Sequence, residues 1–177
     1  MQFSELVKHR QSDRKYADLP VEREKLLQCI EAARLSPSAD NSQPWKFVVV
    51  DDPALKEQVA GCATELGMNK FVHQAPVIVA VVVERMNVLA TIASAIKRKD
   101  FSLLDVGIAV NQLCLQAADL GLGTCIIGWF DEKKVKKLLQ VDRGRRVPLL
   151  VTIGYSEAKT RDKIRKPTEQ MSSWNRY

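Results

Sequence analysis

The sequence of 177 residues has only two histidines, His9 and His73, and its four cysteines form no C-x-x-C pair. A zinc site needs several such ligands at close spacing, so we do not expect one. With so few histidines, a Ser–His or Cys–His nucleophile pair is not expected either. The cysteines lie singly in apolar stretches, which is typical of buried, reduced thiols: Cys29, Cys62, Cys114 and Cys125.

Aromatic residues are also scarce, at 6%, so a core must be built mostly from Leu, Ile, Val and Ala. No uncharged apolar run reaches the roughly eighteen residues of a membrane span, and we predict none. The first ten residues include Glu5, Lys8 and Arg10 and lack the apolar centre of a secretion signal. We therefore expect a cytoplasmic protein that does not bind membranes.

The common nucleotide-binding and hydrolase motifs are missing as well. There is no G-x-x-x-x-G-K-[ST] loop and no G-x-S-x-G nucleophile elbow. Gly121-x-Gly123 resembles the start of a dinucleotide fingerprint, but Ile126 occupies the third glycine position and the segment follows an expected helix. No side chain is therefore predicted to act as a catalyst by itself.

The hydrophobic patterning predicts one domain over residues 1–177, with six helices and four strands in an α+β arrangement. The run 75–83 is continuously apolar, as expected for a strand covered on both faces. The segment 103–120 is apolar on nearly every side, which predicts a central helix covered in part by a second subunit. Helices are expected at 3–8, 21–35, 53–66, 86–99, 103–120 and 132–139, and strands at 47–50, 75–83, 124–127 and 147–153.

The net charge of +6 is concentrated near the C-terminus. Residues 131–177 hold 13 Lys and Arg against 6 Asp and Glu, whereas residues 1–130 hold 14 against 15. The segment 156–177 has little apolar content, so we expect an extended basic tail. Nucleic-acid binding usually involves interleaved aromatics or a recognisable reading module, and neither is present, so a small anion is the better candidate ligand.

Two segments are suited to holding such a ligand. Arg10-x-Ser12-x-Arg14 places two guanidinium groups and a hydroxyl on one side of an extended stretch, and the Arg fork suits phosphate. The tail adds a second cationic cluster around Lys163 and Arg165. The turn 36–45, which contains amides, small polar groups and a tryptophan, suits a planar hydrogen-bonding ligand, although an ordinary capped turn explains it equally well.

Taken together, these segments resemble the FMN-dependent nitroreductase family. The resemblance lies in four stretches, in the family's order and across almost the whole chain: RQSDRKY at 10–16, SPSADNSQPW at 36–45, LGLGTCIIGWF at 120–130 and KIRKP at 163–167. It implies a nitroreductase-like α+β fold, with a central mixed sheet flanked by helices. It also implies an intertwined homodimer with FMN at the interface.

The resemblance assigns candidate cofactor-binding residues. Arg10, Gln11, Ser12 and Arg14 match the phosphate and ribityl site, with Gln11 in place of an arginine or histidine often seen in the family. Asp13 puts a carboxylate beside this site and must point away. The remaining candidates lie farther along the chain: Lys163 and Arg165 at the phosphate, Pro37, Ser38 and Asn41 from the partner chain, the backbone of Ile126, Ile127 and Gly128 at the flavin edge, and Asn69 at the pyrimidine end.

The implied function is an oxidoreductase that uses NADH or NADPH to reduce electron-poor acceptors, such as nitroaromatics or quinones, in a ping-pong reaction through FMN. The alternative is a flavin-binding redox sensor or carrier without steady reductase turnover. Steady consumption of NAD(P)H with an acceptor distinguishes the two. A nucleic-acid module is a third reading, and it requires binding that falls steeply with salt.

Overall fold

The computed structural model describes residues 1–177, and all six helices and four strands are present near their expected positions. The helices are α1 (Phe3–His9), α2 (Arg23–Arg34), α3 (Pro53–Ala63), α4 (Val88–Lys97), α5 (Phe101–Asp119) and α6 (Glu132–Leu138). The strands are β1 (Trp45–Val50), β2 (Val77–Val83), β3 (Gly123–Ile127) and β4 (Arg146–Gly154). Short 3-10 turns complete the chain: η1 (Ala39–Asn41), η2 (Glu65–Gly67), η3 (Lys70–Gln74) and η4 (Thr168–Gln170).

The helix expected over 53–66 ends earlier, at Ala63. Leu66 and Asn69 have φ of 58° and 48°, and Gly67 has φ of 75°. These left-handed conformations cannot continue an α-helix, so the chain turns before η3.

The strands form one sheet in the order β1-β2-β4-β3, and every neighbouring pair is antiparallel. The α+β class is confirmed, but the expectation of a mixed sheet is wrong for the four strands. Parallel pairing occurs only in one isolated bridge, between Ser12 and Thr124. The apolar pattern of a strand shows which of its faces are buried, but it does not show whether the neighbouring strand runs parallel or antiparallel.

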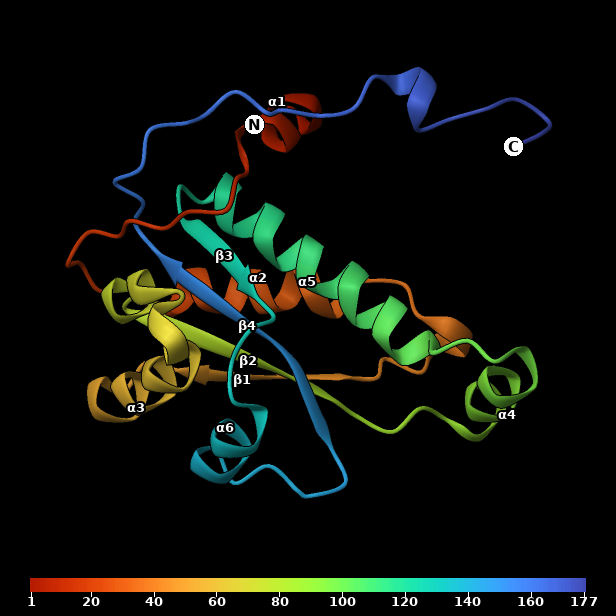
Figure 1. Ribbon diagram of the computed structural model, residues 1–177, viewed down its shortest axis with the longest axis horizontal. Coiled ribbons are helices and arrows are strands. Elements are labelled where there is room, and N and C mark those ends of the chain that lie inside the picture. The colour runs from red at the N-terminus through yellow and green to blue at the C-terminus, as the bar shows by residue number, and fades with distance from the viewer.

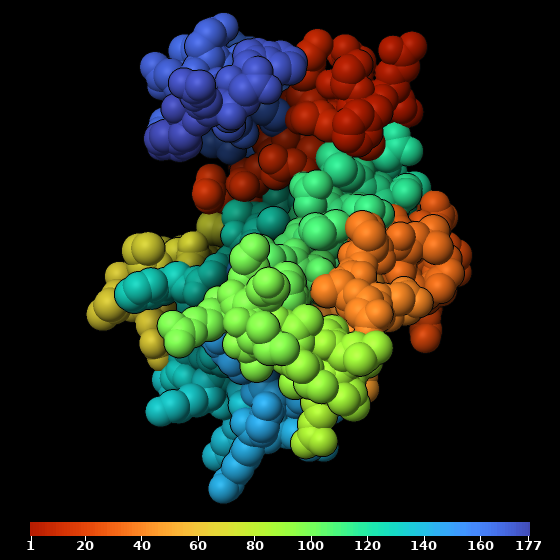
Figure 2. All heavy atoms as spheres, turned by 90° about the vertical axis from the view of Figure 1, so that its right-hand side faces the viewer, coloured from red at the N-terminus to blue at the C-terminus, as the bar shows by residue number.

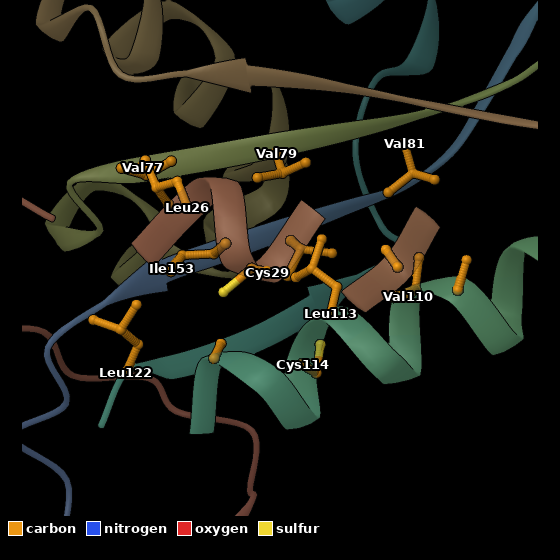
Figure 3. Close-up of a cluster of buried hydrophobic side chains, with 14 of the residues drawn as sticks. Leu26, Cys29, Val77, Val79, Val81, Val110, Leu113, Cys114, Leu122 and Ile153 are labelled. Atoms are coloured by element: carbon orange, nitrogen blue, oxygen red, sulfur yellow. The ribbon is translucent and has the colours of Figure 1, made fainter. Parts of the chain in front are cut away.

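Helices cover both faces of the sheet, which confirms the double coverage expected for the apolar run in β2 (Figure 1). Val77, Val79 and Val81 face α2 and α5, where they pack with Leu113 and Ile153 (Figure 3). Ile78, Ala80 and Val82 lie in the second cluster, with residues of α3 and α6. Successive side chains of a strand point to opposite faces, so an element covered twice must be apolar throughout.

One side of α5 stays uncovered in the single chain. Leu104 and Ile108 are 58% and 42% exposed, whereas Val110 and Leu113 on the opposite side are buried. By length and composition alone α5 could cross a membrane, but half of its apolar stretch is buried within the protein, as in many core helices. The four cysteines are free and buried, as expected.

Candidate functional site

The N-terminal loop after α1 lies along β3, at the edge of the sheet. Ser12 forms the parallel bridge with Thr124, and the Asp13 amide donates to the Thr124 carbonyl at 2.8 Å. This pairing fixes the loop in an extended conformation. The Arg14 guanidinium lies 5.9 Å from the centre of the Phe71 ring, a cation–π contact that links the loop to η3.

The C-terminal tail (residues 156–177) joins the same edge, and in Figure 1 its blue trace meets the red N-terminal segment beside β3. The Lys163 Nζ donates to the Arg10 carbonyl, and the Arg161 guanidinium donates to the Ser12 carbonyl at 2.9 Å. Together the two segments enclose a cavity of about 340 Å³, which we call the basic groove. It is lined by Arg10, Gln11, Ser12, Arg14, Arg161, Asp162, Lys163, Ile164 and Arg165.

The cations of the basic groove repel one another. Partial burial, followed by the nearby charges of Arg10, Arg165 and Arg161, lowers the pKa of Lys163 below its ordinary value. Such a cluster is costly without an anion, because each positive charge disfavours the next. The groove therefore has the chemistry of an anion site, and its bidentate guanidinium groups suit phosphate.

Arg161 was not predicted as a site residue. The three cations at positions 161, 163 and 165 all line the groove, together with Asp162 and Ile164 between them. The alternation Arg161-x-Lys163-x-Arg165 mirrors Arg10-x-Ser12-x-Arg14, and this repeated spacing was the signal available in the sequence.

Asp13 points away from the groove, as it had to. Its side chain is 5% exposed, and its Oδ1 accepts hydrogen bonds from Ser156 Oγ at 2.6 Å and Gln11 Nε2 at 3.0 Å. The Gln11 side chain also donates to the Lys159 carbonyl and accepts from the Arg161 amide at 3.1 Å. Gln11 thus lines the groove while its amide connects the loop to the tail.

The end of β3 exposes one apolar side chain, on the strand that pairs with the N-terminal loop. Ile126 is 41% exposed although its neighbours in β3 are buried. The Thr124 carbonyl points outward, away from β4, and accepts from the Asp13 amide. Backbone N–H and C=O groups of successive residues in an edge strand point alternately toward the neighbouring strand and away from it. The N–H and C=O of Ile126, two residues after Thr124, therefore also point outward. Ile127 is buried, and Gly128 follows it with an exposed backbone.

Asn69 lies near this end of β3, where its side-chain amide joins two loops. The Nδ2 group donates to the Ala63 and Trp129 carbonyls, each at 3.3 Å. Since the amide donors are engaged, only Oδ1 of Asn69 is available to accept a hydrogen bond from a ligand. Its predicted contact with a cofactor stays a prediction.

Pro37, Ser38 and Asn41 lie elsewhere, around η1. The Ala39 amide donates to Asp105 Oδ2 at 3.0 Å, near the start of α5, whereas Asp119 at the other end of α5 holds the N-terminal ammonium group at 2.9 Å. Asp105 and Asp119 are about 21 Å apart along the helix axis. Within one chain, these three residues therefore do not meet the basic groove.

The comparison with known families decides what kind of protein carries this site. The sequence profile of the Nitroreductase family matches residues 7–155. The chain belongs to the nitroreductase family. The match covers α2 to α6, all four strands and three of the four motifs, and it ends before the fourth motif at 163–167.

Individual nitroreductases resemble the chain over most of their length. It is 31% identical to the oxygen-insensitive NADPH nitroreductase of Helicobacter acinonychis (strain Sheeba), over 85% of each protein. Among solved structures, the FMN-dependent nitroreductase of Clostridium difficile R20291 shares 28% identity and a TM-score of 0.80, covering 97% of this chain and 98% of that one. The nitroreductase family protein of Streptococcus pneumoniae TIGR4 shares 28% identity and a TM-score of 0.85, covering 98% and 100%.

Proposed function

We propose that this nitroreductase is an FMN-dependent oxidoreductase, which takes electrons from NADH or NADPH and passes them to electron-poor acceptors such as nitroaromatics or quinones. The observation that carries the proposal is the convergence of cations from both ends of the chain on one groove beside β3. The activities named for its relatives, an NADPH nitroreductase and an FMN-dependent nitroreductase, support the same reading.

The residues at the edge of the sheet fit FMN. The basic groove supplies five cations for a phosphate, namely Arg10, Arg14, Arg161, Lys163 and Arg165. Ser12 adds a hydroxyl next to the strand, and Ile126 adds an exposed apolar surface for a planar ring system. A doubly charged phosphate in this groove relieves the mutual repulsion of the cations.

Bound FMN supplies the capacity to accept electrons from one substrate and release them to another. The chain itself binds and orients that group. Arg10, Arg14, Lys163 and Arg165 would hold the phosphate, and the Ser12 hydroxyl would bind the ribityl chain. The outward N–H of Ile126 and the exposed backbone of Gly128 would border the ring, where an N–H donor stabilises developing negative charge as in an oxyanion hole. The backbone groups of Ile127 face β4 instead, where Ile127 pairs with Leu150.

We include a second copy of the chain in this proposal, because one chain leaves the site incomplete. Figure 2 shows α2, α4 and α5 gathered on one face. Many large apolar side chains there are exposed, including Val88, Leu89, Ile92, Ile96, Leu104 and Ile108. Contiguous apolar surface of this kind marks an interaction site. A second copy on this face could bring its Pro37, Ser38 and Asn41 to the flavin.

The deciding experiment is the absorbance spectrum of the purified protein, followed by anaerobic titration with NADH and with NADPH. We expect a yellow protein whose flavin band bleaches with a nicotinamide donor and returns on addition of a nitroaromatic or quinone. A colourless protein that ignores added FMN overturns the proposal.

Steady-state turnover distinguishes the enzyme from a flavin-binding sensor or carrier. We expect continued NAD(P)H consumption when an acceptor is present in excess. A single reduction without further consumption favours the sensor or carrier. A cytoplasmic location is part of the proposal and is consistent with four free, buried thiols.

A further inference from the structure

We propose that Asp13 is a positioning residue for the FMN phosphate. Its buried carboxylate connects the C-terminal tail to the N-terminal loop, and so it fixes the relative position of the two segments that line the basic groove. This inference rests on the proposed function, since it assigns the groove to the phosphate. It concerns a residue that does not itself line the groove.

The placement of the carboxylate is the first reason. Asp13 lines a neighbouring cavity of about 240 Å³, together with Gly123, Thr124 and Ser156, and this cavity shares Arg10 and Gln11 with the basic groove. An added Cβ on Gly123 would come within 2.8 Å of Asp13 Oδ2, so the strand leaves room for the carboxylate only because residue 123 is glycine. The side chain is thus packed against β3 and lies outside the lining of the basic groove.

The hydrogen bonds of Asp13 are the second reason. Its Oδ1 accepts from Gln11 of its own loop and from Ser156 at the start of the tail. The Ser156 hydroxyl in turn accepts from the Ala158 amide at 3.1 Å. One buried carboxylate therefore joins the two segments beside their backbone pairing, in which Tyr16 bridges Ser156 and the Glu157 amide donates to the Lys15 carbonyl at 3.1 Å.

From that point, contacts lead directly to the cations. Gln11 binds the backbone of Lys159 and Arg161, and the Arg161 guanidinium returns to the Ser12 carbonyl. Lys163 follows two residues later and donates to the Arg10 carbonyl. An extended tail of this kind has little core of its own, so these few contacts decide where its positive charges lie.

Simple electrostatics predicts the opposite effect for loss of this carboxylate. An anion close to the groove repels a phosphate, so its removal alone would tighten FMN binding. Positioning predicts that binding weakens, because the cations of the tail lose their fixed location and ordering them costs affinity. The sign of the change therefore separates the two accounts.

The test is the affinity of Asp13→Ala for FMN and for riboflavin, measured by quenching of flavin fluorescence. We expect FMN binding to weaken about tenfold, the size of one charge-assisted hydrogen bond. Riboflavin lacks the phosphate, so its affinity should change by less than about twofold. Equal losses for both ligands, or FMN binding as tight as in the wild type, would overturn the positioning role.

Two further variants control for a folding defect and for the loss of a negative charge near the groove. Ser156→Ala removes a donor to Asp13 outside the groove but keeps the carboxylate, so it should weaken FMN binding in the same direction with no change of charge near the phosphate. Glu157→Ala is the matched control, since Glu157 pairs with Lys15 at 3.1 Å in an exposed ion pair at the same junction. We expect wild-type or slightly tighter FMN binding for this control, and a loss as large as that of Asp13→Ala would contradict the proposal.

Limited trypsin digestion without flavin gives a second readout. We expect faster cleavage after Lys159 and Arg161 in Asp13→Ala and Ser156→Ala than in the wild type and Glu157→Ala. Unchanged cleavage in both variants contradicts a tail fastened by Asp13. Failure of the wild type to bind FMN overturns the proposed function itself, whereas wild-type binding with unaffected variants overturns only the role of Asp13.

Discussion

Arg14 and Arg165 reach the basic groove from opposite ends of the sequence, about 150 residues apart. Each guanidinium offers a planar pair of donors to a phosphate. At the scale of single residues, the affinity for FMN should therefore depend on both, whichever segment carries them.

We predict that Arg14→Ala and Arg165→Ala each weaken FMN binding by about 1.5–3 kcal/mol, the usual contribution of a charge-assisted hydrogen bond. Titration of the apoprotein with FMN measures the effect. Lys46→Ala is the control, because Lys46 is exposed on β1, at the far edge of the sheet from β3. Unchanged affinity in both arginine variants would remove the groove as the phosphate site.

The lowered pKa of Lys163 predicts a pH dependence. Bound phosphate favours the charged ammonium, so binding raises the pKa of Lys163 back toward its ordinary value. FMN affinity is therefore full below the lowered pKa and falls as the pH rises through it. Lys163→Arg keeps its charge and should flatten this fall.

The measurement is the ratio of FMN to riboflavin affinity between about pH 7.5 and 10, which cancels titration of the flavin ring. A ratio that falls equally in wild type and Lys163→Arg contradicts the assignment.

At the scale of elements, β3 matters because it is an edge strand whose outer side carries the N-terminal loop. Gly123 begins the strand under Asp13 and Ser156. The backbone conformation of Gly123 can be adopted by any residue, because its φ is not positive. Glycine is required here because a Cβ atom would overlap Asp13 and Ser156.

We predict that Gly123→Ala destabilises the protein by about 1–3 kcal/mol through overpacking and weakens FMN binding as the loop shifts. Urea unfolding with a flavin titration measures both effects. Gly144→Ala is the matched control, since an added Cβ there meets nothing within 4 Å. A Gly123→Ala protein as stable as this control would show that the loop is not packed as described.

At the scale of the whole molecule, the uncovered side of α5 and the exposed apolar side chains of α4 need a partner surface. The tail also exposes large apolar side chains, with Met171 and Trp174 70% and 92% exposed. A second copy of the chain accounts for both features and for the distance between η1 and the basic groove.

We predict that Ile108→Glu converts a dimer to a monomer and lowers FMN affinity, because a charge is placed in the apolar face. Sedimentation or light scattering gives the oligomeric state. Leu66→Glu is the control, since Leu66 is 89% exposed in η2, outside this face, and its variant should stay dimeric. A wild-type monomer that binds FMN tightly would contradict the second copy.

The sequence by itself determined the elements, since local periodicity places β2 and α5 within two residues of their observed bounds. It also determined the kinds of groups available for an anion, because Arg, Ser and Lys carry their chemistry wherever they lie. The turn at 64–69 was missed although Gly67 and Asn69 are residue types that readily adopt left-handed conformations, whereas Leu66 offered no such signal.

Only the tertiary structure decided which segments meet. Strand order and direction depend on how helices pack on both faces of the sheet, and a run of apolar residues is the same for every neighbour. The basic groove likewise forms because Gln11, Asp13 and Ser156 join two segments that are remote in sequence. Hydrogen bonds across such separations have no local signature, and so the connection that Asp13 makes between the two ends of the chain became visible only in the folded structure.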